Sequence, residues 1–205
     1  MTHRRGRSRR RRLAWLLAAV ALAGCGSGYR IRPIQLDESA ALTVAADPLL
    51  GQVGLRRCTM AVTLNDVPAR QLEVLPASDD FCLGFSVSSA AIALPPAELR
   101  ALIAHGLAHL ELGHATTLAA PSGTSRSRAR GYTQARSHSV EEEAEADRQA
   151  ARRLTAASGT AGCTALVEVL QRAATEGERW SDWTAQHPLT PARASAARGL
   201  CAAAR

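Results

Sequence analysis

Two helical stretches of this chain each carry a pair of metal-binding side chains spaced four residues apart. His105 and His109 lie in the apolar stretch Ala104–Leu112. Glu143 and Asp147 lie in the acidic stretch that opens a second predicted helix. Residues four apart on an α-helix are separated by about 40° around its axis, so each pair shares one face. Two such faces can meet around one metal ion, and this constrains the fold more than any other feature of the sequence.

Gly106 follows the first histidine and stands where a His-Glu-x-x-His zinc peptidase carries its catalytic carboxylate. In such enzymes the carboxylate takes a proton from a zinc-bound water and passes it to the leaving amine. Gly106 has no side chain for this task, and general acid–base catalysis is typically worth about 10²–10⁴-fold in rate. Glu111 is no substitute, because it lies about 240° around the helix from His105, whereas the lost glutamate would lie about 100° around it.

We predict that His105, His109 and Glu143 bind one metal ion, with zinc as the expected cofactor. Asp147, one turn after Glu143, is predicted to hold a ligating imidazole by its other nitrogen. In the alternative interpretation, the two histidines are packed core residues and the acids belong to a solvated helix start. Loss of the metal along with the carboxylate is a further alternative. The two helix faces taken together favour the metal site.

These motifs resemble those of peptidase family M-48, the gluzincin group that contains the CAAX prenyl proteases and the periplasmic β-barrel assembly-enhancing protease. The family's His-Glu-Leu-x-His-x-x-x-Gly-His helix is matched by His105-Gly106-Leu107-Ala108-His109 with Gly113-His114. Its Glu-x-x-Ala-Asp motif is matched from Glu143 to Asp147. Its late His-Pro, with an arginine six residues after the histidine, is matched by His187-Pro188 and Arg193. The resemblance implies that His187 approaches the metal or the oxyanion, and that Arg193 supports the ligands from behind. His114 and His138 are assigned no role in the site.

The resemblance implies an α+β fold: a mostly helical, zincin-like (gluzincin) domain over residues 51–205 with a small antiparallel sheet. Residue patterns predict strands over Arg57–Leu64, Gln71–Leu75 and Phe81–Ser89. They predict helices over Ala97–Thr117, Val140–Ala156, Cys163–Ala174 and Pro191–Ala204. Residues 119–139, rich in Arg, Ser and Gly, are predicted to form a mobile loop that either contacts anionic lipid or an acidic partner or is simply solvated.

The start of the chain resembles a bacterial lipoprotein signal. An arginine-rich segment precedes the apolar run Leu13–Ala23, which is too short for a permanent membrane span. Leu22-Ala23-Gly24-Cys25 resembles a lipobox, so residues 1–24 are predicted to be a signal peptide, Cys25 to be lipidated and residues 25–50 to be a tether. We expect a location in the bacterial cell envelope, at the outer membrane facing the periplasm, because Gly26 rather than Asp follows Cys25. A signal peptide with a chance cysteine at its cleavage site is the alternative.

Four further cysteines form an even set, which suits the oxidising compartment that export implies. We predict the disulfides Cys58–Cys82 and Cys163–Cys201, because each pair lies within one local region. Four inert buried thiols are the alternative. The positive charge of the chain is no argument for nucleic-acid binding, because seven of its 25 basic residues lie in the leader and the other 18 match 18 acidic residues.

Two functions from different classes follow. The favoured one is a lipid-anchored, weak or inactive peptidase that binds zinc and unfolded or extended polypeptides, with envelope assembly factors among the expected partners. Phe81–Ser89 is the predicted edge strand for such a polypeptide. The second function is an active zinc metalloendopeptidase of envelope quality control that uses a non-standard general base such as His187.

Overall fold

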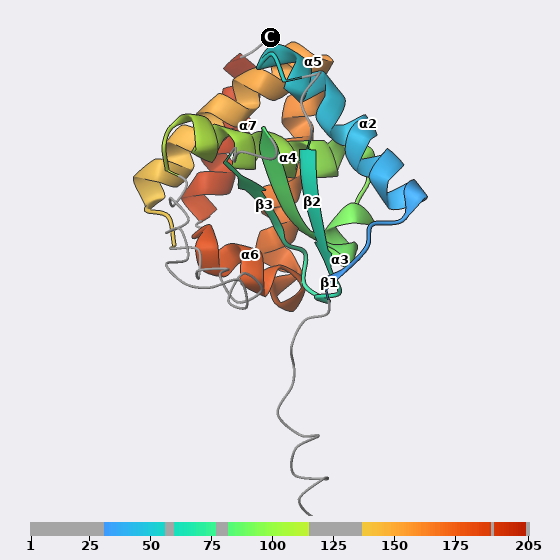
Figure 1. The fold of residues 1–205 in the computed structure, drawn as a ribbon. Helices are drawn as coiled ribbons and strands as arrows, with labels where there is room; N and C mark the ends of the chain where they lie inside the picture. Colours follow the sequence, from blue (N-terminus) through green and yellow to red (C-terminus); the bar gives the residue numbers. More distant parts are fainter. Residues whose placement is uncertain (1–30, 56–59, 77–81, 115–136, 190, 204–205) are drawn as a thin grey trace, which may run out of the picture.

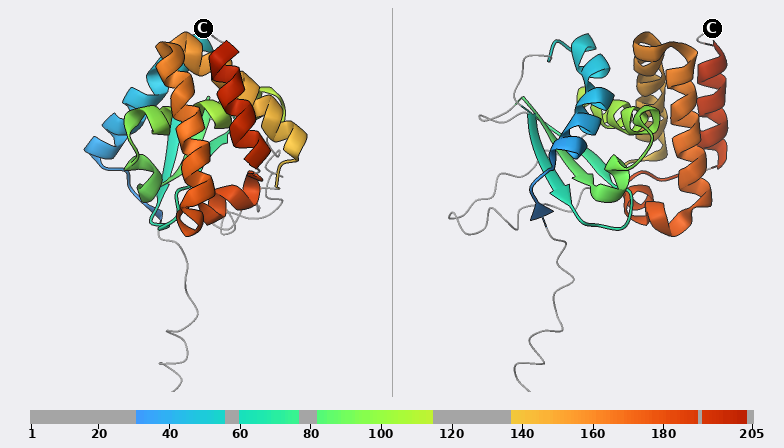
Figure 2. Two further views of the ribbon diagram at one scale, coloured as in Figure 1. Left: turned by 180° about the vertical axis from the view of Figure 1, so that it is seen from behind. Right: turned by 90° about the vertical axis from the view of Figure 1, so that its right-hand side faces the viewer.

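The computed structural model describes residues 31–55, 60–76, 82–114, 137–189 and 191–203 (Figure 1). The elements are β1 (Ile31–Arg32), α2 (Leu36–Gln52), β2 (Met60–Asn65), β3 (Leu72–Leu75), β4 (Leu83–Ser88), α3 (Ser89–Ile92), α4 (Pro96–Glu111), α5 (Val140–Thr175), the 3₁₀ helix η1 (Gly177–Trp180), α6 (Ser181–Gln186) and α7 (Pro191–Ala203). The α+β class is confirmed. Figure 2 shows three layers, with α4 between the sheet on one side and α5 and α7 on the other.

The sheet is mixed, and the prediction that it is antiparallel is wrong for its central pair. The strand order is β1-β2-β4-β3. β2 and β4 run parallel, with Leu64 beside Val87, whereas β3 pairs antiparallel to β4. The turn after Asn65 does not return the chain as a hairpin, because β4 takes the position beside β2 and leaves β3 outside.

This order also corrects the predicted edge strand. β4, within the predicted strand Phe81–Ser89, is paired on both sides and buried at all six positions. An extended peptide needs a strand with an unpaired side, so β4 is excluded by its own neighbours. Within the described part of the chain, β3 is paired on one side only.

Helix α4 forms the middle layer, and its sequence explains both ends. Pro96 occupies the first helical turn, where a missing N–H costs nothing. Gly113 follows the helix with a φ of 72°, a conformation that glycine adopts without strain. The helix therefore ends at Glu111 and not at the predicted Thr117. Its apolar side chains are buried on nearly every side, as expected of a helix covered by both other layers.

Helix α5 begins with a capping box, in which the Ser139 hydroxyl accepts the Glu142 backbone N–H and the Glu142 carboxylate accepts the Ser139 N–H. Three acidic residues in its first turn also suit the helix dipole. Non-helical backbone at Ser158 and Gly159, where Gly159 has a φ of 65°, kinks the helix. The two helices predicted over Val140–Ala156 and Cys163–Ala174 are therefore present as the two arms of α5, which are separate helices that meet at this break.

The predicted tether over residues 25–50 is too long. Residues 36–52 form α2, and its side chains Leu42, Ala45, Ala46 and Leu49 are buried in the core. The folded body thus includes most of the segment predicted to be a linker, because a face of leucine and alanine side chains is apolar enough to bury against α4.

The disulfide predicted between Cys163 and Cys201 is confirmed and joins the second arm of α5 to α7. Cys82 is also disulfide-bonded, and its predicted partner Cys58 lies outside the described residues. Cys25, the predicted signal peptide and most of the predicted mobile loop lie outside them as well. No helix of the described segments is both long and apolar enough to cross a membrane.

Candidate metal centre

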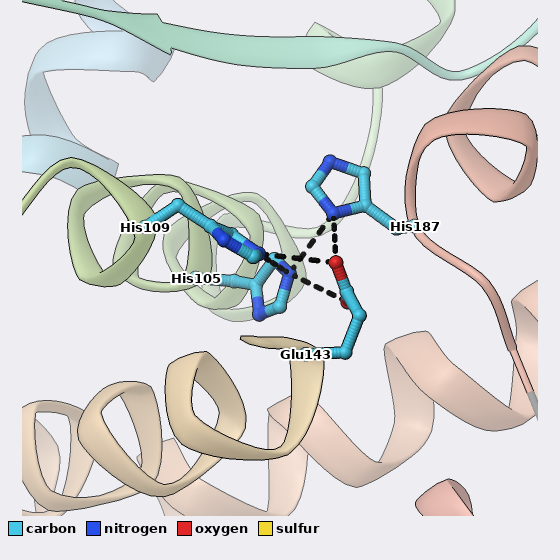
Figure 3. A group of neighbouring side chains, drawn as sticks. All are labelled: His105, His109, Glu143 and His187. Atoms are coloured by element: carbon cyan, nitrogen blue, oxygen red, sulfur yellow. Dashed lines mark hydrogen bonds and ion pairs between the residues drawn. The ribbon is translucent and has the colours of Figure 1, made fainter. Parts of the chain in front are cut away.

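Four potential metal ligands from three separate elements converge between the helical layers. His105 and His109 come from α4, Glu143 comes from the first turn of α5, and His187 is the residue that follows α6. Their ligand atoms all lie within 4.8 Å of one another, and Figure 3 shows the four side chains pointing toward a common point. All four are buried. The predicted set of His105, His109 and Glu143 is brought together, and His187 joins it as a fourth candidate ligand.

The spacing of the ligand atoms fits a metal ion. Nε2 of His105 lies 3.0 Å from Nε2 of His109 and 3.3 Å from Nδ1 of His187. Oε1 of Glu143 lies 3.2 Å from Nε2 of His109 and 2.9 Å from Nδ1 of His187. Ligand atoms about 2.0–2.1 Å from a tetrahedral zinc ion are about 3.3 Å apart. These four of the six distances between the ligand atoms are close to this value, so the cluster can hold a metal ion.

Asp147 and Arg193 support the cluster from behind, as predicted. Oδ1 of Asp147 lies 3.1 Å from Nδ1 of His105, so the carboxylate stands on the side of the ring that faces away from the other ligands. Arg193 donates hydrogen bonds of 2.6 Å and 2.9 Å to Asp147, and its Nη1 lies 2.5 Å from Oε2 of Glu143. A carboxylate behind a ligating imidazole fixes the orientation of its ring, and the guanidinium in turn fixes the carboxylate.

Three of the four candidate ligands are held in the protonation states that a metal needs. Burial lowers the pKa of His109 and of His187 to about 4, although Glu143 opposes this shift. Burial disfavours ionisation of Glu143, but hydrogen bonds with His105, His109 and His187 hold the pKa of its carboxyl well below the usual range. Burial would likewise raise the pKa of Asp147, but Arg193 and His105 bring it to about 2. Near pH 7 His109 and His187 are therefore neutral and Glu143 is a carboxylate, the forms that bind a cation. His105 differs: burial opposes its protonation, but hydrogen bonds with Asp147 and Glu143 raise its pKa, so metal binding competes with a proton on this ring.

His138, which the sequence analysis left without a role, lies against the cluster. Its ring stacks on His109, with centroids 3.9 Å apart, and lies 5.1 Å from the ring of His187. Its backbone N–H donates a 2.9 Å hydrogen bond to the carbonyl of Gln186, which joins the start of α5 to the end of α6. No motif in the sequence marks this residue. The hydrogen bond between the backbones of His138 and Gln186, which are far apart in the chain, places the His138 ring beside the cluster.

We expect His138→Ala to weaken zinc binding by about tenfold, the lower end of the usual effect of residues that orient ligands. The physical reason is the loss of the stacked ring that fixes the plane of His109. His138→Phe keeps an aromatic face and is expected to bind zinc as tightly as the parent protein. Competition with a chromophoric chelator measures both affinities. Equal affinity in the alanine variant would show that the stacking has no role.

The acids considered as replacements for the missing carboxylate lie away from the cluster. Glu111 forms an ion pair with Arg153 and accepts a hydrogen bond from Gln149. Glu145 is half exposed, and its carboxylate lies 3.4 Å from Nε2 of His114. Gly106 sits between the two α4 ligands with no side chain. These contacts agree with the expectation that Glu111 does not take the place of a base at residue 106, and they occupy Glu145 elsewhere as well.

The chain matches no protein-family model, no curated protein and no solved structure. The resemblance to peptidase family M-48 therefore depends on the motifs and on the site that they form, and it enters the function below as a proposal.

Proposed function

We propose that this protein is a zinc-binding, non-hydrolytic relative of the M-48 peptidases, held at the bacterial envelope by lipid on Cys25. The observation that carries the proposal is the buried cluster of His105, His109, Glu143 and His187 beside a residue 106 that has no carboxylate. The cluster supports the proposed metal binding, and the glycine at position 106 supports the proposed loss of hydrolysis, because it provides no general base.

The donor set supports zinc as the metal. Imidazole nitrogens and a carboxylate are among the ordinary protein ligands of zinc, and it is the number of protein ligands, four in place of three, that distinguishes a closed structural site from a catalytic one. Catalytic zinc sites use three protein ligands and leave a position for water. The side chains of the four candidate ligands are less than one tenth exposed, so the cluster has the features of the closed type.

The alternative of an active metallopeptidase requires a base beside the metal ligands. His187, the candidate for that task, lies among the ligand atoms, with its Nδ1 3.3 Å from Nε2 of His105. A group that binds the metal through this nitrogen has no free lone pair there to accept a proton. The geometry thus favours His187 as a ligand, and no observation favours the hydrolytic function.

The proposed partner remains an unfolded or extended polypeptide, including envelope assembly factors. Strand β3 replaces Phe81–Ser89 as the candidate for its docking, because β3 has one unpaired side within the described sheet. An extended chain pairs with such a side through its backbone, so this mode of binding requires neither the metal nor a catalytic base.

Metal content and peptidase activity measured on the same purified sample test the proposal. We expect about one zinc ion per chain, and casein cleavage at least about a hundredfold slower than that of an active gluzincin, because general-base help is absent. His109→Ala serves as the control for metal-dependent cleavage. Cleavage at an ordinary gluzincin rate that disappears in this variant would refute the non-hydrolytic function, and a chain without zinc would refute the metal centre.

A further inference from the structure

Gly106 lies directly beneath strand β3, at a distance that leaves no room for a side chain. An ideal Cβ built on Gly106 would lie 2.4 Å from Cγ2 of Val74 and 3.2 Å from its Cβ. The backbone nitrogen of Val74 would lie 3.6 Å away. Non-bonded carbon atoms have their optimal separation at about 3.5–4.0 Å, so the methyl group of Val74 fills the space of the first side-chain atom of residue 106.

Neither partner of this contact can move aside easily. Val74 is buried, and its strand pairs with β4, where Val74 lies beside Phe85. A β-branched side chain has few accessible rotamers, so its methyl group cannot rotate away at low cost. On the other side, α4 is the central helix of the domain and carries two of the candidate ligands, His105 and His109, on either side of Gly106.

We infer that Val74 and Gly106 form a complementary contact that closes the metal centre on the side of the missing carboxylate. While Val74 is present, the fold accepts only glycine at position 106. The inference deepens the proposed non-hydrolytic function: the loss of the general base and the docking of β3 on α4 are one structural feature. Restoring a glutamate at residue 106 alone therefore destabilises the domain instead of creating a peptidase.

Alanine substitutions distinguish the effect of this contact on the melting temperature from the effect of helix propensity. Alanine favours a helix interior over glycine, so propensity alone predicts that Gly106→Ala raises the melting temperature. The contact with Val74 predicts the opposite sign, and we expect a fall of at least about 3 °C. Gly199→Ala is the matched control, because Gly199 is also helical and nothing lies within 4 Å of its ideal Cβ. This control should raise the melting temperature by about 2–4 °C.

The second test is the same substitution in a Val74→Ala background. This background removes the atom at 2.4 Å and leaves the Cβ contact at 3.2 Å, which a displacement of a few tenths of an ångström relieves, much less than the contact with Cγ2 would require. Gly106→Ala should then cause no fall in the melting temperature relative to Val74→Ala alone. If Gly106→Ala fails to fold while the double variant folds, the inference is supported in its strongest form.

Two outcomes would overturn the inference. One is a rise in melting temperature for Gly106→Ala like that of Gly199→Ala. The other is an equal loss, or an equal failure to fold, with and without Val74, since the valine would then not be the cause. Zinc content is measured separately on the parent protein. A metal-free parent would refute the proposed function while leaving this pattern of melting temperatures unchanged, so the two failures are distinguishable.

Discussion

Zinc added in excess to the metal-free protein should raise its melting temperature by about 10 °C. A ligand present at a thousand times its dissociation constant stabilises the folded state by about 4 kcal/mol, and each kcal/mol shifts the melting temperature of a chain of this size by about 2–4 °C. The unfolded chain has no preformed site, so the binding free energy contributes to folding.

Glu143→Ala tests whether the candidate ligands are responsible for the zinc-dependent rise in melting temperature. We expect the variant to lose most of the zinc-dependent rise, because it removes the only candidate ligand with a negative charge. Glu141→Ala is the control, since Glu141 lies in the same first turn of α5 and is exposed. Differential scanning fluorimetry with and without zinc measures both. A full zinc-dependent rise in the Glu143 variant would place the metal elsewhere.

Removing the guanidinium behind the ligands should have the second large effect. Arg193→Ala leaves Asp147 and Glu143 without their buried cation, and breaking a buried ion pair from one side typically costs about 3–5 kcal/mol. Arg198→Ala, on the exposed face of the same helix α7, is the matched control and should change the free energy of unfolding by less than about 0.5 kcal/mol. Urea denaturation measures both values.

A further comparison separates the contribution of the Arg193–Asp147 ion pair to the free energy of unfolding from that of the packing of the arginine side chain. Asp147→Asn in the Arg193→Ala background removes one of the two carboxylates that lose their contact with the arginine in the first substitution. Neighbouring residues in one network usually show coupling, so this second change should cost less than it does in the parent protein. Strictly additive losses would mean that Arg193 stabilises the domain by packing and not through its contact with Asp147.

The ligand set could be predicted from the sequence to the extent that it follows from local helical geometry. His105 with His109, and Glu143 with Asp147, are each one helical turn apart, so a helix places each pair on one face whatever surrounds it. His187 and Arg193 could be assigned only through the resemblance to a family. His138 could not be found in either way, because its stack on His109 depends on the path of a connecting segment.

The sheet and the role of Gly106 depend on contacts between distant residues. Period-two patterns locate three strands to within a few residues, but they do not reveal that β4 inserts between β2 and β3. Helix propensity makes Gly106 look unfavourable, and the sequence offers no reason for it. The reason is Val74, which lies 32 positions earlier in the chain and meets the glycine only after the sheet docks on α4.

The covalent link between Cys163 and Cys201 has a kinetic consequence for the neighbouring centre. It ties α7, which carries Arg193 and begins shortly after His187, to α5, which carries Glu143. Stripping the cation with a chelator therefore cannot release the C-terminal segment from the rest of the body. We expect emptying and refilling to be a rapid, reversible cycle in the oxidised protein, because the bridge closes a loop that holds His187 near the other candidate ligands when the metal is absent.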